Sequence, residues 1–482
     1  MKTDGMIRTG LCFLRDCVKI CPGEAARRVR EKQEDARIRS VRARGLQLRP
    51  ESAQEPCGQA RTIRMDGKEY TVFTGPDGQM HPDALRACEK AVRETGADLI
   101  YTDEVFFTGS PGDRNVPYFK PDYGPDSLRG CNYIGPFLVC RSGLLKEAGA
   151  EDYAALDADG QWDAVIRMTG KAKKICHIPK TLYYRLIPEG EEIPEPALRR
   201  ISDPVEGEPL VSILIPNRDH REDLKRCINS IREKTTYGNW EILIIENNST
   251  DHETFRYYRE LEADDRIRVI SREGAFNYSA VNNLGAREAK GEQILLLNND
   301  TEVISPGWIQ EMLMYAQRQD VGAVGAKLYY PDGSVQHAGI GVGIKMLAGH
   351  YFRGFAGDSG GYFGRLKYAQ NVSAVTAACM MIPRRVYEEM NGLDERFSIV
   401  FNDVDLCLRI RQAGYLIVWT PWAELTHYES RSRGPDEDTP EKKRFFVRET
   451  NRFLKKWYKV LEAGDPYYNV NLTRWKEDFS LR

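Results

Sequence analysis

Polar and acidic side chains follow several apolar segments of this chain, at the point where each segment ends. Side chains of these types bind divalent cations, accept hydrogen bonds from ligands and act as general bases. They stand too far apart in the sequence to act together unless the fold collects them at one place. The residues are Asn217, Asp219, Glu246, Asn248 and Asp300.

The apolar segments have the pattern of buried parallel strands. Val211–Pro216 (VSILIP), Trp240–Glu246 (WEILIIE) and Gln293–Leu297 (QILLL) are continuous apolar runs, which are typical of strands covered on both faces. Segments of helical periodicity alternate with them. We therefore predict an α/β fold with a mostly parallel sheet and helices on both faces. Ligands of such sheets bind at the carboxyl ends of the strands, where these polar residues stand. Further predicted elements are a strand at 266–270 and helices at 223–233 and 280–289.

Length and composition set broad limits. A chain of 482 residues suggests two to four domains. Its formal net charge of −2 argues against a general nucleic-acid binder. Eleven cysteines in a chain of this length indicate a reduced, cytoplasmic protein rather than a disulfide scaffold. No apolar stretch approaches the ~20 residues that span a bilayer.

Composition shifts divide the chain into five parts. Residues 24–49 hold nine Arg/Lys and four Asp/Glu, a net charge of +5. They favour a solvated, partly helical arm, with peripheral attachment to an anionic membrane face as the alternative. The predicted parts are a basic arm (1–60), a smaller α/β module (61–190), a Pro/Glu-rich linker (191–208), the main α/β domain (209–465) and a C-terminal tail (466–482).

Five segments stand in a fixed order along the main domain: VSILIPNRD, EILIIENNSTD, ILLLNNDT, FNDVDLCLR and LTHYES. With them, the chain from Val211 to about Ser432 resembles the family-2 glycosyltransferases, enzymes of the GT-A fold that use nucleotide sugars. The resemblance implies an inverting transferase that moves a sugar from a nucleotide-diphosphate sugar to a glycan or lipid-linked glycan acceptor. The implied context is bacterial surface polysaccharide synthesis on the cytoplasmic side. The resemblance says little about which sugar is moved.

The same resemblance implies the catalytic residues. Asp403 matches the general base that activates the acceptor hydroxyl. Asp300 and His427 match the residues that hold Mg²⁺ or Mn²⁺, and such an ion neutralises the charge that grows on the departing diphosphate. This chain has Asn298-Asn299-Asp300 where the family has Asp-x-Asp, so a single carboxylate remains. Asp405 is either a further site residue or a carboxylate that satisfies a helix N-terminus.

Donor binding is assigned to residues at the strand ends and in two later segments. An acidic or amide group there can accept from a base N–H or a ribose hydroxyl. Asn283 resembles the family's Asn before a helical glycine. Arg433, or else Arg431, can pair with the diphosphate because a guanidinium binds phosphate oxygens in a bidentate manner, with an exposed basic loop as the alternative. The full set is Pro216, Asn217, Asp219, Glu246, Asn248, Asn283, Asn298, Asn299 and Arg433.

The module at 61–190 resembles the second half of the main domain. Residues 132–149 are similar to 372–392, and the 16-residue spacing from Asp163 to Pro179 recurs from Asp405 to Pro421. On this alignment Asp77 stands at the Asp300 position, Gln161 at the Asp403 position and Tyr184 near the His427 position. We therefore predict a truncated, degenerate copy that does not transfer sugar and serves acceptor binding or packing.

Two Gly-rich stretches, 337–343 and 360–364, are interpreted either as mobile loops that form an acceptor wall or lid, or as plain connecting loops. Two further functions remain open. The first is a non-catalytic glycan- or nucleotide-sugar-binding protein. The second is a nucleotidyltransferase, which would be expected to carry a Gly-rich basic loop after the first strand, where this chain has Asn217-Arg218-Asp219-His220.

Overall fold

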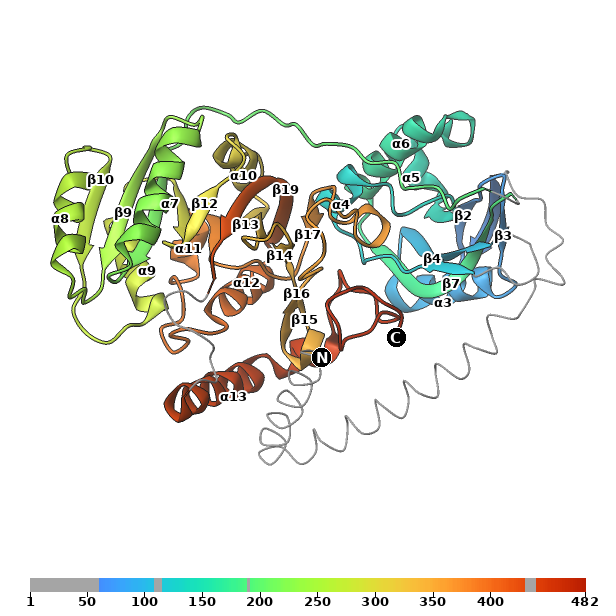
Figure 1. Ribbon diagram of the computed structural model, residues 1–482. Helices are drawn as coiled ribbons and strands as arrows, with labels where there is room; N and C mark the ends of the chain where they lie inside the picture. The colour runs from blue at the N-terminus through green and yellow to red at the C-terminus, as the bar shows by residue number, and fades with distance from the viewer. Residues whose placement is uncertain (1–59, 108–114, 189–190, 430–438) are drawn as a thin grey trace.

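The computed structural model describes residues 60–107, 115–188, 191–429 and 439–482 (Figure 1). Two α/β lobes lie side by side, and an extended segment, residues 191–210, joins them along one edge of the molecule (Figure 1). The predicted basic arm and Arg433 lie outside the described residues. Within the described ranges, no helix is both long enough and apolar enough to cross a bilayer.

The larger sheet contains the strands that the sequence predicted as buried. Its strands are β8 (Val211–Asn217), β9 (Trp240–Glu246), β10 (Ile267–Ser271), β11 (Gln293–Leu297), β12 (Thr301–Val303), β13 (Val321–Tyr329), β14 (Val335–His337), β17 (Gln370–Asn371), β18 (Cys379–Pro383) and β19 (Leu416–His427). Their order is β10-β9-β8-β11-β18-β13-β19-β12, with β14 beside β13 and β17 beside β19. The first four strands run parallel, whereas β18 runs antiparallel to β11. A separate pair is formed by β15 (Ile340–Val342) and β16 (Ala348–His350).

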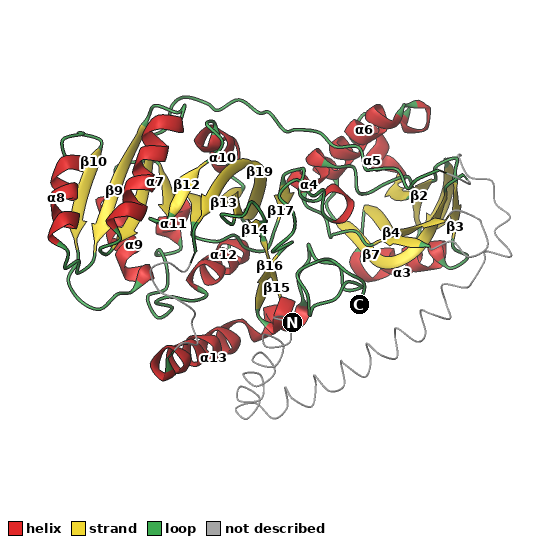
Figure 2. Ribbon diagram, in the orientation of Figure 1, coloured by secondary structure: helices red, strands yellow, loops and turns green. Residues whose placement is uncertain are grey.

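Helices cover both faces of this sheet (Figure 2). They are α7 (Arg221–Lys234), α8 (His252–Leu261), α9 (Tyr278–Glu288), α10 (Trp308–Ala316), α11 (Arg384–Glu389), α12 (Asn402–Gln412) and α13 (Pro440–Ala463), with short 3-10 turns at Ile344–Met346 and Tyr362–Gly364. Alternate residues of β8 face different cores. Ile213 packs in the core that contains Leu224 of α7, and Leu214 packs in the core that contains Val281 of α9. The predicted α/β fold with helices on both faces is confirmed.

A smaller sheet lies in the N-terminal lobe. Its strands are β1 (Arg61–Met65), β2 (Lys68–Phe73), β3 (Gly78–Met80), β4 (Leu99–Phe107), β5 (Val116–Tyr118), β6 (Leu138–Arg141) and β7 (Ile175–Leu186). Its helices are α3 (Ala84–Thr95), α4 (Pro125–Gly130), α5 (Ser142–Glu147) and α6 (Ala158–Lys171), with a 3-10 turn at Tyr153–Ala155. The strand order is β1-β2-β6-β4-β7-β3, and β5 lies beside β4.

The two sheets share a pattern of strand order and direction. In the smaller sheet, β2-β6-β4-β7 has antiparallel, antiparallel and parallel pairs in that order. In the larger sheet, β11-β18-β13-β19 has the same sequence of directions. A short strand also pairs antiparallel with the last strand in each, β3 with β7 and β12 with β19.

The segment after α13 connects the two lobes, and we call residues 464–482 the C-terminal strap. Phe479 of the strap is buried and stacks on Phe352 of the main domain at 4.5 Å between ring centroids. Asn469 of the strap donates from its amide to Asp103 Oδ1 of the smaller sheet at 3.0 Å. The predicted tail is therefore an integral part of the packing.

The Gly-rich stretch at 360–364 also lies between the lobes. The Phe363 ring stacks on Tyr118 with centroids 4.1 Å apart, and the Tyr362 hydroxyl accepts from the Phe119 backbone N–H at 2.9 Å. The structure favours the connecting-loop interpretation of this stretch over the mobile lid, because both aromatic side chains pack against the N-terminal lobe. The stretch at 337–343 is mostly strand, in β14 and β15.

Candidate functional site

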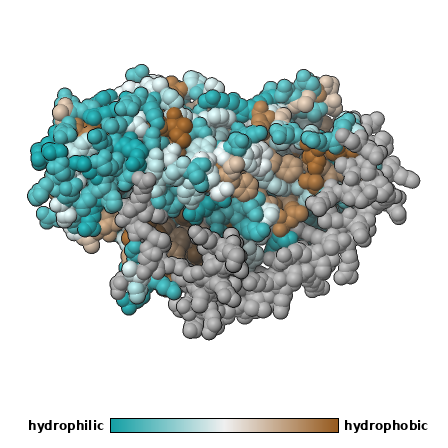
Figure 3. All heavy atoms as spheres, viewed as in Figure 1, coloured by the Kyte–Doolittle hydropathy of each residue, from teal (hydrophilic) through white to brown (hydrophobic). Residues whose placement is uncertain are grey.

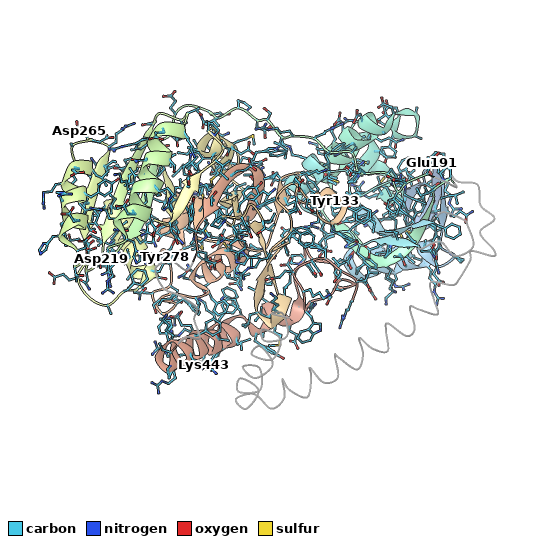
Figure 4. All side chains as sticks on the ribbon, in the orientation of Figure 1. Tyr133, Glu191, Asp219, Asp265, Tyr278 and Lys443 are labelled. Carbon is cyan, nitrogen blue, oxygen red and sulfur yellow. The ribbon has the colours of Figure 1, made fainter. Side chains whose placement is uncertain are left out.

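The carboxyl ends of β8, β9 and β11 meet at one edge of the larger sheet, because these strands are parallel neighbours. Asn299 Nδ2 donates to Asn217 Oδ1 at 2.6 Å. The Thr250 backbone N–H donates to Asp219 Oδ1 at 2.7 Å, which ties the loops after β8 and β9 together. Pro216 lies within β8 just before this edge. Figure 4 shows the labelled Asp219 at this side of the main domain.

Glu246 and Asn248 lie at the same edge, with hydrogen bonds to the protein itself. The Glu246 carboxylate accepts from the Ser249 N–H and hydroxyl, both at 2.5 Å, and from the Tyr258 hydroxyl at 2.6 Å. Asn248 adopts a left-handed φ of 60° and donates to the Gly274 carbonyl at 2.6 Å. Its side chain remains exposed. Glu246 therefore shapes the loop, while Asn248 faces solvent at the rim.

Asp300 and His427 face each other beyond the ends of β11 and β19. Pairing of β12 with β19 places Thr301 opposite His427, and Asp300 Oδ1 lies 3.2 Å from His427 Nε2. Both side chains are largely buried. Burial by itself raises the pKa of Asp300, but the hydrogen bond and charge interaction with His427 outweigh it, and the net shift is downward. Asp300 is therefore ionised at neutral pH.

Gln336 fixes which nitrogen of His427 carries the proton. His427 Nδ1 lies 2.6 Å from Gln336 Oε1, an atom that only accepts, so Nδ1 is the donor. Gln336 Nε2 donates to Glu429 Oε2 at 3.2 Å, which sets the orientation of the amide. His427 Nε2 therefore faces Asp300, where it donates to the carboxylate when it carries a proton and offers an electron pair when it does not. The position between them takes a proton when the ring is charged and accepts a metal ion when it is neutral.

Asp403 lies in the first turn of α12. Its Oδ1 accepts from the Val404 N–H at 2.8 Å and its Oδ2 from the Ala377 N–H at 3.2 Å. Burial raises the pKa of Asp403, and these hydrogen bonds, with one from the Thr376 hydroxyl, offset the increase only in part. A carboxylate with a raised pKa is a stronger proton acceptor, as a general base requires.

The start of β18 connects Asp403 with the turn that carries Asp300. The Ala378 carbonyl accepts from the Asn298 N–H at 3.1 Å, while the Ala377 N–H binds Asp403. Asn298 Nδ2 also lies 3.2 Å from His427 Nε2. Ala377 therefore contacts Asp403, and the next residue, Ala378, contacts the turn that carries Asp300.

Tyr278 of α9 lies beside both acidic groups. Its hydroxyl donates to the Ala377 carbonyl at 3.0 Å. Burial raises the pKa of Tyr278, and the charges of Asp403 and Asp300 add to the increase. The Ala377 N–H binds Asp403, and the Ala378 carbonyl binds the turn that carries Asp300, so the two carboxylates stand at the same edge of the sheet (Tyr278 is labelled in Figure 4).

Asp405 belongs to the packing of α12, and a site role for it is wrong. Its side chain is fully buried. It accepts from Lys456 Nζ at 2.6 Å, from Trp457 Nε1 at 2.8 Å and from Arg409 Nε at 2.9 Å. The carboxylate therefore binds two cations and an indole, of which Lys456 and Trp457 belong to α13.

Asn283 does not join the donor-binding residues. Its amide nitrogen donates to the Leu393 carbonyl at 2.9 Å and to Glu395 Oε1 at 3.0 Å. Its oxygen accepts from the Tyr387 hydroxyl at 2.7 Å and from the Leu393 N–H at 2.9 Å. All four hydrogen-bonding positions of the amide are used, so Asn283 fastens α9 to the segment after α11 and has no group left for a ligand.

Sequence reasoning missed three positioning residues, Tyr278, Gln336 and Glu449. Glu449 of α13 is fully buried, and its carboxylate accepts from the Ser398 N–H at 2.6 Å and from the Val400 N–H at 2.8 Å. It thereby holds the backbone that leads into α12 and Asp403. No local pattern indicates these roles, because the partners lie far away in the sequence.

The described ranges contain no group of three or more His, Cys, Asp or Glu side chains that converges on one metal position. Asp300 and His427 therefore form a two-residue arrangement. A carboxylate and an imidazole leave most positions around a divalent ion to waters and substrate oxygens.

Comparison with known proteins finds a family that is similar to part of this chain. Residues 212–390 match the model of glycosyl transferase family 2. An uncharacterised protein, y4gI of Sinorhizobium fredii, is 40% identical over 451 residues, which are 86% of this chain and 49% of that protein. The O-antigen biosynthesis protein RfbC of Myxococcus xanthus is 34% identical over 453 residues, 86% of this chain and 34% of that protein.

A third relative matches a shorter part of this chain. The N-acetylglucosaminyl-diphospho-decaprenol L-rhamnosyltransferase of Mycobacterium tuberculosis is 29% identical over 151 residues, 30% of this chain and 49% of that protein. The chain spans about half of the first relative and about a third of RfbC. The family match covers β8, β9, β11 and the Asp300 turn, and it ends shortly before α12. Residues 212–390 of this chain are therefore similar to the domain of glycosyl transferase family 2.

Proposed function

We propose that this chain is an inverting glycosyltransferase that moves a sugar from a nucleotide-diphosphate sugar to a glycan or lipid-linked glycan acceptor. The observation that carries the proposal is the position of Asp300 and Asp403 at one sheet edge, joined by Ala377 and Ala378. The family match supports the donor class.

Asp403 is the proposed general base. It takes the proton of the acceptor hydroxyl at its carboxylate while that oxygen attacks the anomeric carbon and the diphosphate leaves from the opposite side. One displacement of this kind inverts the configuration at that carbon. The raised pKa of Asp403 and its fixed position at the start of α12 support this role.

Asp300 and His427 are the residues that would hold a divalent ion, Mg²⁺ or Mn²⁺. Their fit rests on the two electron-pair donors that converge at 3.2 Å and on the ionised state of Asp300. When bound, the ion neutralises negative charge on the leaving diphosphate. Asn299 and Asn248 at the neighbouring strand ends would contact the nucleotide half of the donor, and Asn217 would hold Asn299 in place.

The names of the relatives support a biosynthetic context for this chain. RfbC is an O-antigen biosynthesis protein, and the mycobacterial relative is named for transfer to a diphospho-decaprenol-linked sugar. We infer that this chain also extends a bacterial surface polysaccharide, on the cytoplasmic side and with a lipid-linked acceptor.

The N-terminal lobe is proposed to be a degenerate copy of the second half of the transferase domain. Its shared strand order supports this, and so does the backbone around Asp77, whose carbonyl accepts from the Leu186 N–H as the Asp300 carbonyl accepts from the Tyr428 N–H. The pairing of Gly78 with Arg185 matches that of Thr301 with His427, so Arg185 rather than Tyr184 is the counterpart of His427. The aromatic contacts of Tyr362 and Phe363 favour packing as its role.

A donor screen tests the proposal. Purified protein is incubated with nucleotide sugars and Mn²⁺, and release of the nucleotide diphosphate is measured with and without a chelator. We expect release with one donor class that the chelator abolishes. Asp403→Asn should keep metal-dependent nucleotide binding, measured by calorimetry, and lose most turnover. Turnover by the variant equal to that of the parent would remove Asp403 from the base role.

A further inference from the structure

Helix α13 is amphipathic, and its inner face is fixed by packing. Phe453, Trp457 and Leu461 are buried at four-residue spacing, which places them on one side of the helix. Glu449 is on the same side and is used by the backbone before α12. The helix is therefore held rigidly against the site domain along this face.

The outer face of α13 is cationic. Arg448, Lys455 and Lys459 are all exposed, and their spacing of seven and four residues places them in one stripe opposite Trp457. Within the described part of the chain, none of the three forms an ion pair with a carboxylate. Lys456 differs, because it turns inward to Asp394 and Asp405.

Few acidic side chains lie near this stripe on α13. Among the acidic side chains that the structure describes on α13, Glu449 is buried and Glu462 is exposed. Tyr458 lies beside the stripe and is 44% exposed, so an aromatic side chain with a polar tip accompanies the cations. In Figure 3 the visible part of α13, at the lower left, is hydrophilic, and Figure 4 labels Lys443 at its start.

We propose that the outer face of α13, defined by Arg448, Lys455, Tyr458 and Lys459, docks on an anionic phospholipid surface. The chain as a whole carries a net charge of −2, so the positive stripe is a local feature. From Arg448 to Lys459 the stripe runs along about 17 Å of the helix axis, which suits a flat array of phosphate headgroups. The outer face has few apolar side chains, so attachment is electrostatic and reversible.

Docking in this way has a consequence for the site, which rests on the proposed function. The inner face of α13 packs on α12, which carries Asp403 in its first turn. A membrane-bound α13 therefore keeps the proposed base at a fixed height above the lipid surface.

Vesicle sedimentation of the full chain tests the proposal. The triple variant R448Q/K455Q/K459Q is compared with the parent on mixed vesicles of phosphatidylcholine and phosphatidylglycerol and on pure phosphatidylcholine vesicles. The matched control is R86Q/K90Q/R93Q, which removes three exposed cations at similar spacing from α3. We expect the α13 variant to lose binding to the anionic vesicles by on the order of a hundredfold, because each cation near such a surface contributes about fivefold. The control should bind as the parent does.

Several results would overturn the proposal. Equal binding of the α13 variant and the parent would place the attachment elsewhere, for example in the basic arm. Equal binding of the parent to neutral vesicles, or binding insensitive to salt, would exclude an electrostatic surface. Retention on heparin without vesicle binding would identify a soluble polyanion as the partner. No donor or acceptor is present in these assays, and the triple variant should keep parental activity on a water-soluble acceptor, so this proposal and the transferase proposal fail separately.

Discussion

Gln336 decides how His427 presents itself to Asp300. A histidine ring has two nitrogens, and the partner of one determines the state of the other. The 2.6 Å contact from His427 Nδ1 to Gln336 Oε1 leaves Nε2 facing the carboxylate. The chemistry of the pair therefore depends on a residue that touches neither the metal position nor the donor.

Gln336→Leu should weaken metal binding. Without the acceptor at Oε1, the ring can adopt the other tautomer and place a proton on Nε2, which competes with the ion. We expect the affinity for Mn²⁺, measured by electron paramagnetic resonance in the presence of nucleotide, to fall about 10- to 100-fold. Gln317→Leu is the matched control, because Gln317 makes similar hydrogen bonds to the Pro204 carbonyl and the Glu206 N–H away from the site. Unchanged Mn²⁺ affinity in Gln336→Leu would contradict the positioning role.

Two elements together determine the position of Asp403. Helix α12 carries the carboxylate, and Glu449 of α13 binds the backbone that precedes the helix. Phe401, just before α12, has a left-handed φ of 62°, a strained conformation for a phenylalanine. The ring of Phe401 stacks on Phe453 of α13 at 4.7 Å, so α13 supports this turn from both polar and apolar contacts.

Glu449→Gln should lower the turnover number with little effect on the KM for the donor. The amide nitrogen cannot accept a hydrogen bond, so backbone N–H groups at 398–400 lose partners and the start of α12 loosens. Loss of such charge-assisted bonds costs about 2 kcal/mol of unfolding free energy. Steady-state kinetics and urea unfolding measure the two effects. Glu462→Gln on the exposed side of the same helix is the control, and a parental turnover number for Glu449→Gln would show that the turn holds without this carboxylate.

Structure that depends on local sequence pattern could be predicted, whereas roles that depend on long-range contacts could not. The continuous apolar runs predicted β8 and β9 to within one residue, because burial on both faces leaves a direct mark on the sequence. Asn283 looked like a ligand residue, but its partners lie more than 100 residues away in the sequence at Leu393 and Glu395. The role of Asp405 likewise depends on Lys456. Such contacts exist only after folding, and no spacing rule indicates them.

A polar cluster of Asp103, Asp122, His177 and Asn469 joins the N-terminal lobe to the C-terminal strap. Asp103 and Asp122 accept from the two ring nitrogens of His177, each at 2.9 Å. Asn469 of the C-terminal strap donates to Asp103 and to the Lys120 carbonyl. Both ring nitrogens of His177 face carboxylates, so the ring is bound as a cation. Burial opposes that charge, but the two carboxylates outweigh burial, and the pKa of His177 is raised.

Stability should therefore depend on pH in a defined direction. A histidine whose pKa is raised by folding contributes stability that is fully present below its unfolded pKa and is lost as pH rises through its folded pKa. The melting temperature of the parent should fall over this interval, above pH ~6.5. His177→Gln should show a smaller fall, and His252→Gln, at an exposed position, should behave as the parent. Parallel melting curves for His177→Gln and the parent across this range would contradict the role of the cluster.

The bond between Asp103 and Asn469 joins residues that are 366 positions apart. A ribosome that adds roughly 5 to 20 residues per second needs on the order of 20 to 70 seconds to travel that distance. During this time the smaller sheet has left the exit tunnel, while Asp103 has its partner His177 but still lacks Asn469. The N-terminal lobe can therefore reach its final state only after almost all of the described chain, including residues 209–465, has been synthesised.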